Sequence, residues 1–214
     1  MENTHNFYGG TVVGLEDIHS IRKIADRYGL HMHLDGARVF NAAKAINVAA
    51  STICADFDSV QFCLSKGLSA PIGSIIVGSR PFIKEARYFR KMIGGGMRQS
   101  GIIAAAGIVA LKNNIDRLVE DHDNAKLLAT GIKNIEGIGI DMASVQTNMV
   151  RIDTSGLFIT GAELVKHLNS QGVLCSAQGK YIVRFVTHRH ITRNDIITAI
   201  SVIEKVCESL RKRS

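Results

Sequence analysis

The chain has 214 residues, 46% hydrophobic and 21% charged, which is enough apolar sequence to bury a core and excludes a disordered protein. No apolar run reaches the roughly 20 residues that cross a bilayer, and the first ten residues are polar, so we expect a cytoplasmic protein with no membrane role. The formal net charge is +7, but the basic residues are scattered and no recognition motif accompanies them, so nucleic-acid binding is not expected.

Four cysteines stand far apart in the sequence and form no CxxC pair: Cys54, Cys63, Cys175 and Cys207. A structural zinc site is therefore not expected. We predict free, mostly buried thiols in a reducing compartment.

The first part of the chain is typical of a strand–turn–helix–strand unit. A strand is predicted at residues 11–13, and apolar residues at helical spacing predict a helix over 15–28, with Gly29 at its end. The segment LHMHLD, residues 30–35, follows as a strand. Such units build parallel sheets.

The following elements continue the alternation of helices and strands. They are predicted, in chain order, as a helix over 41–53, strands over 59–66 and 74–78, and helices over 81–92, 99–113 and 115–135. Pro81 stands at the start of its helix, where proline is tolerated.

The last part of the chain has a different pattern, with more strands. Strands are predicted over 146–153, 172–177 and 181–188, and helices over 161–170 and 192–210. Thr192 and Asp195 resemble a capping box at the start of the last helix. We predict a large α/β domain over 1–115 and a small α+β domain over 116–214.

Charged residues follow two of the predicted strands. In HLDGARVF, Asp35 ends a strand and Arg38 follows three residues later, which a local ion pair would also explain. In VQFCLSKGLSAPIG, Lys66 follows a strand and precedes glycines, although an exposed lysine in a turn would look the same. A lysine held among apolar groups or near cations has a lowered pKa, and its neutral amine can attack a carbonyl and form a Schiff base.

An open α/β sheet places its ligand outside the carboxyl ends of its strands. Asp35 and Lys66 both stand at such ends, so the two side chains can face one pocket. Pyridoxal phosphate needs that pair, because a lysine binds its aldehyde and an acid faces its pyridine nitrogen. The sequence therefore predicts a pyridoxal-phosphate site in which Asp35 keeps the ring nitrogen protonated.

Several longer segments resemble one known family, the low-specificity L-threonine aldolases of the β-eliminating lyase group of fold-type-I pyridoxal-phosphate enzymes. The segments are HLDGARVFNAA, CLSKGLSAPIGS, RKMIGGGMRQSGIIAAAGIVAL, ENTHN and RFVTHRHIT. The resemblance covers nearly the whole chain and implies a partial fold-type-I large domain followed by a small α+β domain. It also implies retro-aldol cleavage of L-threonine or L-allo-threonine to glycine and acetaldehyde.

The resemblance implies specific roles for the residues of the site. Lys66 would bind the cofactor covalently, Asp35 would pair with its ring nitrogen, and Arg38 would lie on the O3 side of the ring. Arg184, in RFVTH, is similar to the arginine that holds the substrate carboxylate, and a guanidinium binds a carboxylate in bidentate fashion.

Two further basic residues, Lys91 and Arg98, flank MIGGGM and match residues that line the family's site. The resemblance implies that they reach the cofactor phosphate, the substrate or a neighbouring subunit. A solvated helix face would equally account for Lys91. Among the histidines, His31 and His33 are expected to serve packing, and none is assigned as a general base.

The family's chains begin well before ENTHN, so we expect this chain to lack an N-terminal third. The family also implies a homo-oligomer, a tetramer, with sites at subunit contacts. Two hypotheses therefore stay open: a lyase with the residues named above, or a truncated and catalytically inactive fragment of one. A basic binding protein is a third and weaker alternative.

Overall fold

The structure, a computed structural model, describes residues 1–212 and divides the chain into two compact units. Unit 1 comprises Met1–Thr4 and Val12–Leu118, and unit 2 comprises His5–Thr11 and the chain from Val119 onward. The division into domains over 1–115 and 116–214 stays a prediction, and the structural units differ from it by assigning His5–Thr11 to unit 2.

Unit 1 contains a three-stranded sheet in the order β1-β2-β3. The strands are β1 (His33–Asp35), β2 (Ser59–Cys63) and β3 (Ser74–Gly78). β1 and β2 run parallel, as the sequence predicted, with Asp35 opposite Gln61. β3 is antiparallel to β2, so the sheet is mixed, because the short loop between β2 and β3 allows only a reversal of direction.

The strand predicted at residues 11–13 is wrong, because Thr11 makes only an isolated bridge to His5. The backbone N–H and C=O groups of Val13 are hydrogen-bonded instead to the side chain of Asn3. Asn3 Oδ1 accepts from Val13 N at 3.2 Å, and Asn3 Nδ2 donates to Val13 O at 3.1 Å. An amide side chain thus replaces the neighbouring strand that the apolar TVV pattern suggested.

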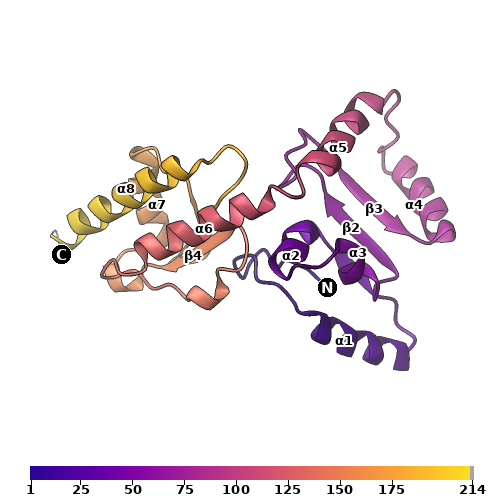
Figure 1. Cartoon of the computed structure of the whole chain (residues 1–214), viewed down its shortest axis with the longest axis horizontal. Helices are drawn as coiled ribbons and strands as arrows, with labels where there is room; N and C mark the ends of the chain where they lie inside the picture. The colour runs from indigo at the N-terminus through magenta and orange to yellow at the C-terminus, as the bar shows by residue number, and fades with distance from the viewer. Residues whose placement is uncertain (213–214) are drawn as a thin grey trace. The chain divides into compact units, whose positions relative to one another are not determined.

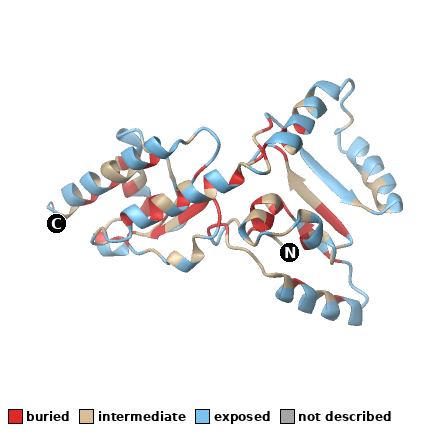
Figure 2. Cartoon of the chain, viewed as in Figure 1, coloured by how far each residue is buried: buried red, intermediate tan, exposed pale blue. Residues whose placement is uncertain are grey.

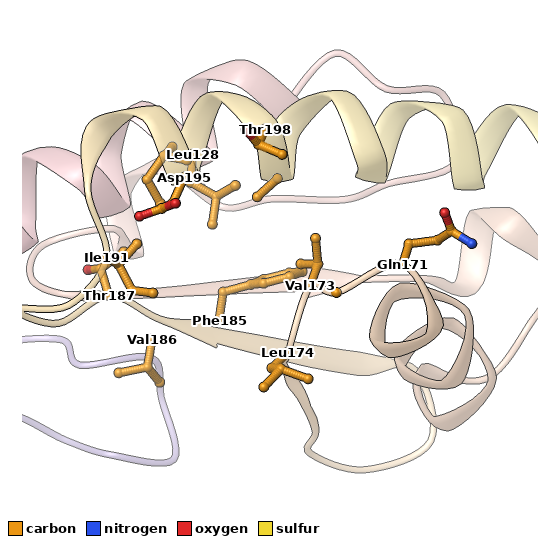
Figure 3. Close-up of a pocket in the computed structure, with 13 residues that line it drawn as sticks. Leu128, Gln171, Val173, Leu174, Phe185, Val186, Thr187, Ile191, Asp195 and Thr198 are labelled. Carbon is orange, nitrogen blue, oxygen red and sulfur yellow. The ribbon is translucent and has the colours of Figure 1, made fainter.

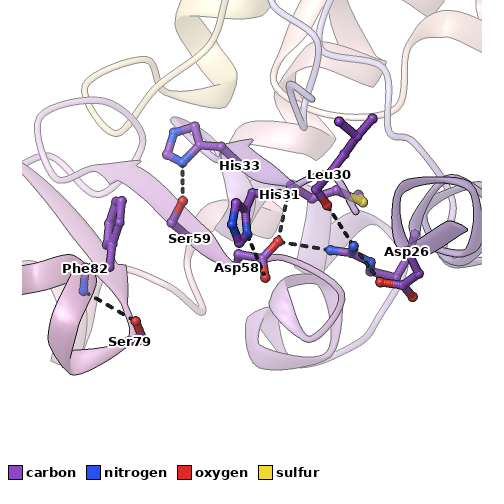
Figure 4. Close-up of polar contacts among 10 residues, drawn as sticks. Asp26, Leu30, His31, His33, Asp58, Ser59, Ser79 and Phe82 are labelled. Atoms are coloured by element: carbon purple, nitrogen blue, oxygen red, sulfur yellow. Dashed lines mark hydrogen bonds and ion pairs between the residues drawn. The ribbon is translucent and has the colours of Figure 1, made fainter. Parts of the chain in front are cut away.

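The helices of unit 1 are α1 (Leu15–Arg27), α2 (Val39–Ala45), α3 (Ala50–Cys54), α4 (Arg80–Met92) and α5 (Gly101–Asn113). The single helix predicted over 41–53 is wrong, since it is broken into α2 and α3. Asn47 lies between them in the left-handed region, with φ of 53°, which ends the first helix. Ser79 caps α4 by accepting from Phe82 N at 3.4 Å (Figure 4).

The core of unit 1 lies around β1, β2 and the first three helices. One cluster includes Ile18, Leu34 and Ile53, and a second includes Leu64 and Leu118. β3 and α4 take little part in these clusters. Figure 2 shows them largely exposed, and α4 has no buried residue. The apolar surface of β3 and α4 is therefore left uncovered within unit 1.

Asp58 joins the amino ends of β1 and β2 (Figure 4). Its Oδ2 accepts from Met32 N at 2.7 Å and from Arg22 Nη1 at 3.0 Å. The Met32 N–H, and then the Arg22 guanidinium, hold the pKa of Asp58 below its usual value. This carboxylate ties the loop before β1 to α1 and to β2.

Two histidines beside this network are exposed and polar in their contacts. His31 Nδ1 lies 3.7 Å from Asp58 Oδ1, and His33 Nδ1 lies 2.8 Å from Ser59 Oγ (Figure 4). The prediction that both serve packing is wrong, because it is Met32 and Leu34 that point into the core. The predicted alternation of the two faces is present, but the buried face carries Met32 and Leu34 and the exposed face carries the histidines.

Unit 2 contains an antiparallel sheet in the order β4-β6-β5. Its elements are α6 (Leu118–Ile132), η1 (Met142–Ser144), β4 (Met149–Asp153), η2 (Ser155–Leu157), α7 (Gly161–Ser170), β5 (Ser176–Ala177), β6 (Ile182–Val186) and α8 (Arg193–Arg211) (Figure 1). The predicted strands and helices are all present, with shorter strands. The two 3₁₀ turns were not predicted.

Alternation along the strands of unit 2 decides which face the helices cover. Val150 and Ile152 of β4, with Val183 and Phe185 of β6, join one buried cluster with residues of α6, α7 and α8. The residues between them point to the opposite face. That face therefore carries the charged side chains of the sheet, which become important below.

The first turns of α7 and α8 are closed by reciprocal side-chain and backbone hydrogen bonds. Thr192 Oγ1 accepts from Asp195 N at 3.2 Å, and Asp195 Oδ2 accepts from Thr192 N at 2.8 Å. The capping box predicted at α8 is confirmed, and Thr160 with Glu163 forms the same arrangement at α7. Within residues 1–212, none of the helices is both long and apolar enough to span a bilayer.

Candidate functional site

Asp35 lies at the carboxyl end of one strand, and Lys66 lies just beyond the end of its parallel neighbour. Asp35 is the last residue of β1, and β2 ends at Cys63, three residues before Lys66. Because β1 and β2 run parallel in register, their carboxyl ends meet at one edge of the sheet. Both side chains are exposed there. The structure therefore brings the predicted carboxylate and the predicted amine to the same edge.

The carboxylate of Asp35 is oriented by two donors. Asp35 Oδ1 accepts from Ala37 N at 3.1 Å and from Gln61 Nε2 at 3.0 Å. Gly36 N donates to Gln61 O at 2.7 Å, and a Cβ at Gly36 would lie 2.9 Å from that oxygen, so only glycine fits here. The backbone after β1 thus turns tightly against β2 and fixes the carboxylate at the sheet edge.

Lys66 stands in a loop that packing and hydrogen bonds hold in place. Ser69 N donates to Lys66 O at 2.8 Å, and Leu64 N donates to Gly73 O at 2.9 Å at the base of the loop. A Cβ at Gly67 would lie 2.8 Å from a methyl carbon of Leu118, so the backbone beside Lys66 packs directly against a core side chain. The backbone at Lys66 is therefore fixed, while its side chain is exposed.

The remaining cations predicted in unit 1 come from helix ends and a loop. Arg38 is half-buried at the N-cap of α2, where its carbonyl accepts from Asn41 N at 2.9 Å. Lys91 is in the last turn of α4 and exposed, and its side chain lies along Gly96, where a Cβ would be 2.6 Å from Lys91 Cδ. Arg98 is exposed in the segment before α5. Their convergence on Lys66 stays a prediction.

Arg184 belongs to unit 2, so its role at the edge of the β1–β2 pair stays a prediction. It lies on β6, half-buried, and its Nη1 donates to Asn6 Oδ1 at 2.9 Å. Burial lowers the pKa of the guanidinium from its usual value, although the group stays charged at neutral pH. Among the described residues, Arg184 Nε has no hydrogen-bond partner.

A cavity of about 210 Å³ lies in unit 2 between β6 and α8 (Figure 3). Its walls are mainly apolar, including Leu128, Val173 and Phe185. The one carboxylate in the wall, Asp195, is already bound to Thr192 in the capping box. This cavity offers no amine and no second charged group, so it is not the candidate site.

Two residues of the site were not found from the sequence. Gln61 orients Asp35, and Asn6 binds Arg184, although neither was assigned a role. The signal for Gln61 was a polar residue inside the apolar stretch SVQFC, and for Asn6 it was the motif ENTHN. Across residues 1–212, no group of three or more His, Cys, Asp or Glu side chains is arranged to hold a metal ion.

Comparisons with known proteins relate the chain to one family. The family described as beta-eliminating lyase matches residues 1–155. The low-specificity L-threonine aldolase 1 of Arabidopsis thaliana is 41% identical over 215 residues, which cover all of this chain and 60% of that protein. The low specificity L-threonine aldolase of Escherichia coli strain K12 is 43% identical over 198 residues, which cover 92% of this chain and 56% of that protein.

Solved structures match over nearly the whole chain. The threonine aldolase of Leishmania major superposes with a TM-score of 0.75 at 17% identity, covering 97% of this chain and 60% of that one. A structure from Listeria monocytogenes EGD-E superposes with a TM-score of 0.80 at 20% identity, covering 98% of this chain and 60% of that one. These likenesses confirm the predicted α/β fold class. The chain spans about 60% of the length of the relatives it matches.

Proposed function

Because this chain belongs to the beta-eliminating lyase family, we propose that it acts in the pyridoxal-phosphate-dependent cleavage of L-threonine or L-allo-threonine to glycine and acetaldehyde. The observation that carries the proposal is the meeting of Asp35 and Lys66 at one edge of the parallel pair β1–β2. The family match and the names of the relatives, threonine aldolases in a plant and a bacterium, support it.

The residues present fit pyridoxal phosphate. Lys66 supplies a primary amine for its aldehyde, and the carboxylate of Asp35, held by Ala37 N and Gln61 Nε2, supplies an acceptor for a protonated ring nitrogen. Arg38 and Arg98 are proposed to bind the O3 side of the ring and the phosphate. When bound, the cofactor supplies an electron sink for the pair released at the substrate α-carbon.

The chain's own residues bind and orient the reacting groups. Asp35 holds the proton on the ring nitrogen, which keeps the ring electron-poor, and Gln61 keeps that carboxylate oriented. Arg184 is proposed to bind the substrate carboxylate, since a guanidinium offers two parallel donors to it. Lys91 is proposed to contribute positive charge on the substrate side. Threonine is then held with its α-amino group available to exchange with the amine of Lys66.

The proposal includes assembly with further copies of the chain. Unit 1 leaves apolar residues exposed on β3, on α4 and directly after α4: Ile75, Ile76, Val77, Tyr88, Phe89, Met92 and Ile93. Figure 2 shows both elements largely exposed. A surface of this kind commonly marks an interface with another polypeptide. A homo-oligomer, a tetramer by the resemblance, working in the cytoplasm, is the form that we propose.

A second candidate is a catalytically inactive form, and one observation favours it. The side chains of Asp35, Lys66, Lys91 and Arg98 are all exposed in this chain. Sites of this chemistry exclude water, which strengthens the electrostatic interactions within them. On this alternative the chain by itself leaves the site too open for catalysis and needs a covering polypeptide.

Absorbance titration with pyridoxal phosphate tests the proposal. We expect the purified chain to develop a visible band from the bound cofactor, and a Lys66→Ala variant to lose it. Lys112→Ala is the matched control, because Lys112 is an exposed lysine on α5 in the same unit, and this variant should keep the band. A parent chain without a band would contradict the proposal, whereas a band without threonine cleavage would favour the inactive form.

A further inference from the structure

Two arginines lie directly opposite each other on the face of the unit 2 sheet that the helices do not cover. Arg151 of β4 and Arg184 of β6 are paired in the antiparallel register. Directly opposed residues have Cβ atoms about 4.5–5.5 Å apart, and like charges in that position destabilise a sheet. Both side chains are only half-exposed. Some other part of unit 2 must therefore offset the repulsion.

The turn His5–Thr11 supplies separate partners for the two arginines. Asn6 Oδ1 accepts from Arg184 Nη1 at 2.9 Å. The next two residues stack on the other arginine, since Arg151 Cζ lies 6.0 Å from the ring centroid of Phe7 and 5.7 Å from that of Tyr8. Aromatic faces attract a guanidinium at this range. Three consecutive residues of one turn thus engage both members of the arginine pair.

The turn is fixed to the sheet by its own hydrogen bonds and by close packing. His5 N donates to Thr11 O and Gly10 N donates to His5 O, both at 2.9 Å. Thr147 Oγ1 donates to Gly10 O at 2.7 Å in a buried position. A Cβ at Gly10 would lie 2.4 Å from Thr147 Oγ1, so the backbone approaches the sheet as closely as glycine allows. The turn that carries Asn6 is therefore closed at its ends and fixed to Thr147.

The contact with Asn6 determines which part of the Arg184 guanidinium stays available. Nη1 is bound to Asn6, whereas Nε has no partner among the described residues. A carboxylate binds a guanidinium through two parallel donors. With one N–H of Nη1 engaged by Asn6 and Nε buried, the remaining N–H groups of Nη1 and Nη2 are the donors left for a carboxylate.

We propose that Asn6 is a positioning residue for Arg184, held by the turn His5–Thr11, and that it presents the remaining Nη donors of the guanidinium to the carboxylate of an amino-acid substrate. The identity of the substrate rests on the proposed function, whereas the contact between Asn6 and Arg184 does not. A neutral amide suits this role. It orients the cation without cancelling its charge, whereas an aspartate at position 6 would compete with the substrate carboxylate.

The contact can be tested without cofactor or turnover, by NMR of the arginine side chains in the labelled chain. The signals of Arg184 are assigned by their absence from the spectrum of the Arg184→Lys variant. In the parent, rotation of the Arg184 guanidinium about Nε–Cζ should be slow enough to give separate Nη1 and Nη2 signals. In Asn6→Ala the two signals should merge. Asn169→Ala is the matched control, because Asn169 is another asparagine of unit 2 whose amide oxygen accepts from a backbone N–H, that of Cys175. In this variant the Nη1 and Nη2 signals of Arg184 should stay separate.

Asn6→Asp separates orientation from charge and covers the case in which Asn6→Ala fails to fold. It keeps the acceptor and the size of the side chain, so the two Nη signals should stay separate. In an active preparation, Asn6→Ala and Asn6→Asp should each raise KM for threonine about tenfold with kcat changed less than twofold. Asn6→Ala loses a contact that serves binding, whereas the new carboxylate in Asn6→Asp competes with that of the substrate. Asn169→Ala should change neither constant.

The outcomes distinguish this inference from the proposed function. Arg184 signals that are already merged in the parent, or that stay separate in Asn6→Ala, would overturn the positioning role. Unchanged KM in both Asn6 variants would overturn it as well. If the NMR results are as expected but the parent neither binds pyridoxal phosphate nor cleaves threonine, the positioning contact stands and the proposed function fails.

Discussion

Gln61 lies directly opposite Asp35 in the parallel pair β1–β2, and its side-chain amide donates to Asp35 Oδ1 at 3.0 Å. The two residues are 26 positions apart in the sequence, and the strand register alone brings them together. This amide keeps the carboxylate oriented at the sheet edge and adds no charge of its own. The acid proposed to face the cofactor thus depends on a neighbour that carries no charge.

Replacing Gln61 should therefore weaken cofactor binding. We expect Gln61→Ala to raise the Kd for pyridoxal phosphate about fivefold, since one hydrogen bond to a charged group is lost. Gln61→Glu should weaken binding further, because a second carboxylate beside Asp35 disfavours ionisation of both. Absorbance titration measures the Kd, with Gln171→Ala, an exposed glutamine of unit 2, as the control. Equal Kd values in all four proteins would contradict the role of Gln61.

The carboxylate of Asp58 should make unit 1 sensitive to acid. Its pKa is lowered in the folded state by the Met32 N–H and by Arg22, so its contribution to stability is present above the unfolded pKa of about 4. That contribution is lost as the pH falls through the folded pKa. We expect Asp58→Asn to lower Tm at pH 7 and to match the parent near pH 2.

Calorimetry between pH 7 and pH 2 measures the Tm difference between the parent and Asp58→Asn. A Tm difference between parent and Asp58→Asn that stays constant from pH 7 to pH 2 would show that the loss comes from altered packing. It would then not come from the hydrogen bonds to the charged carboxylate.

The capping box of α8 should contribute measurably to the stability of unit 2. Thr192→Ala removes the acceptor for Asp195 N and should lower the free energy of unfolding by about 1 kcal/mol. Thr198→Ala is the matched control, since Thr198 is an exposed threonine within α8 whose hydroxyl donates to the carbonyl of Asn194. Urea unfolding followed by circular dichroism compares the two. Equal losses would mean that helix propensity, and not the cap, sets the effect.

Gly10 should be far less tolerant of substitution than another glycine with a positive φ. Gly10 has φ of 76° and Gly172 has φ of 83°, so alanine is strained at both, by about 1–2 kcal/mol. Only at Gly10 does the new Cβ also meet an atom, Thr147 Oγ1 at 2.4 Å, while nothing lies within 4 Å at Gly172. We expect Gly10→Ala to lower Tm clearly more than Gly172→Ala. A similar loss in both would mean that the turn moves away from the sheet at little cost.

The sequence predicted the order of elements well because apolar spacing and capping residues are local signals. It placed Asp35 and Lys66 at strand ends. Asp35 is the last residue of β1, Lys66 lies three residues beyond β2, and the parallel register puts the carboxyl ends of both strands at one edge. It failed at the segment 11–13, where a side chain of Asn3 satisfies the backbone in place of a strand. That contact joins residues ten positions apart, and no periodic pattern in the sequence signals it.

Other contacts of the candidate site depend on tertiary structure in the same way. Asn6 and Arg184 are 178 positions apart, and neither residue type predicts the other. The break between α2 and α3 was missed because Asn47 adopts a left-handed conformation inside an alanine-rich segment that favours a helix. The buried side of β1 was misjudged because HMHLD alternates polar and apolar residues, and the histidines were taken as the packed side.

The most direct test of the account is to reduce the chain with borohydride in the presence of pyridoxal phosphate and to locate the added mass by peptide mass spectrometry. We expect one major modified residue, Lys66, and no comparable modification in the Lys66→Ala variant. Modification spread over exposed lysines such as Lys84 and Lys112, or concentrated on a lysine other than Lys66, would contradict the claim that the amine at the end of β2 binds the cofactor.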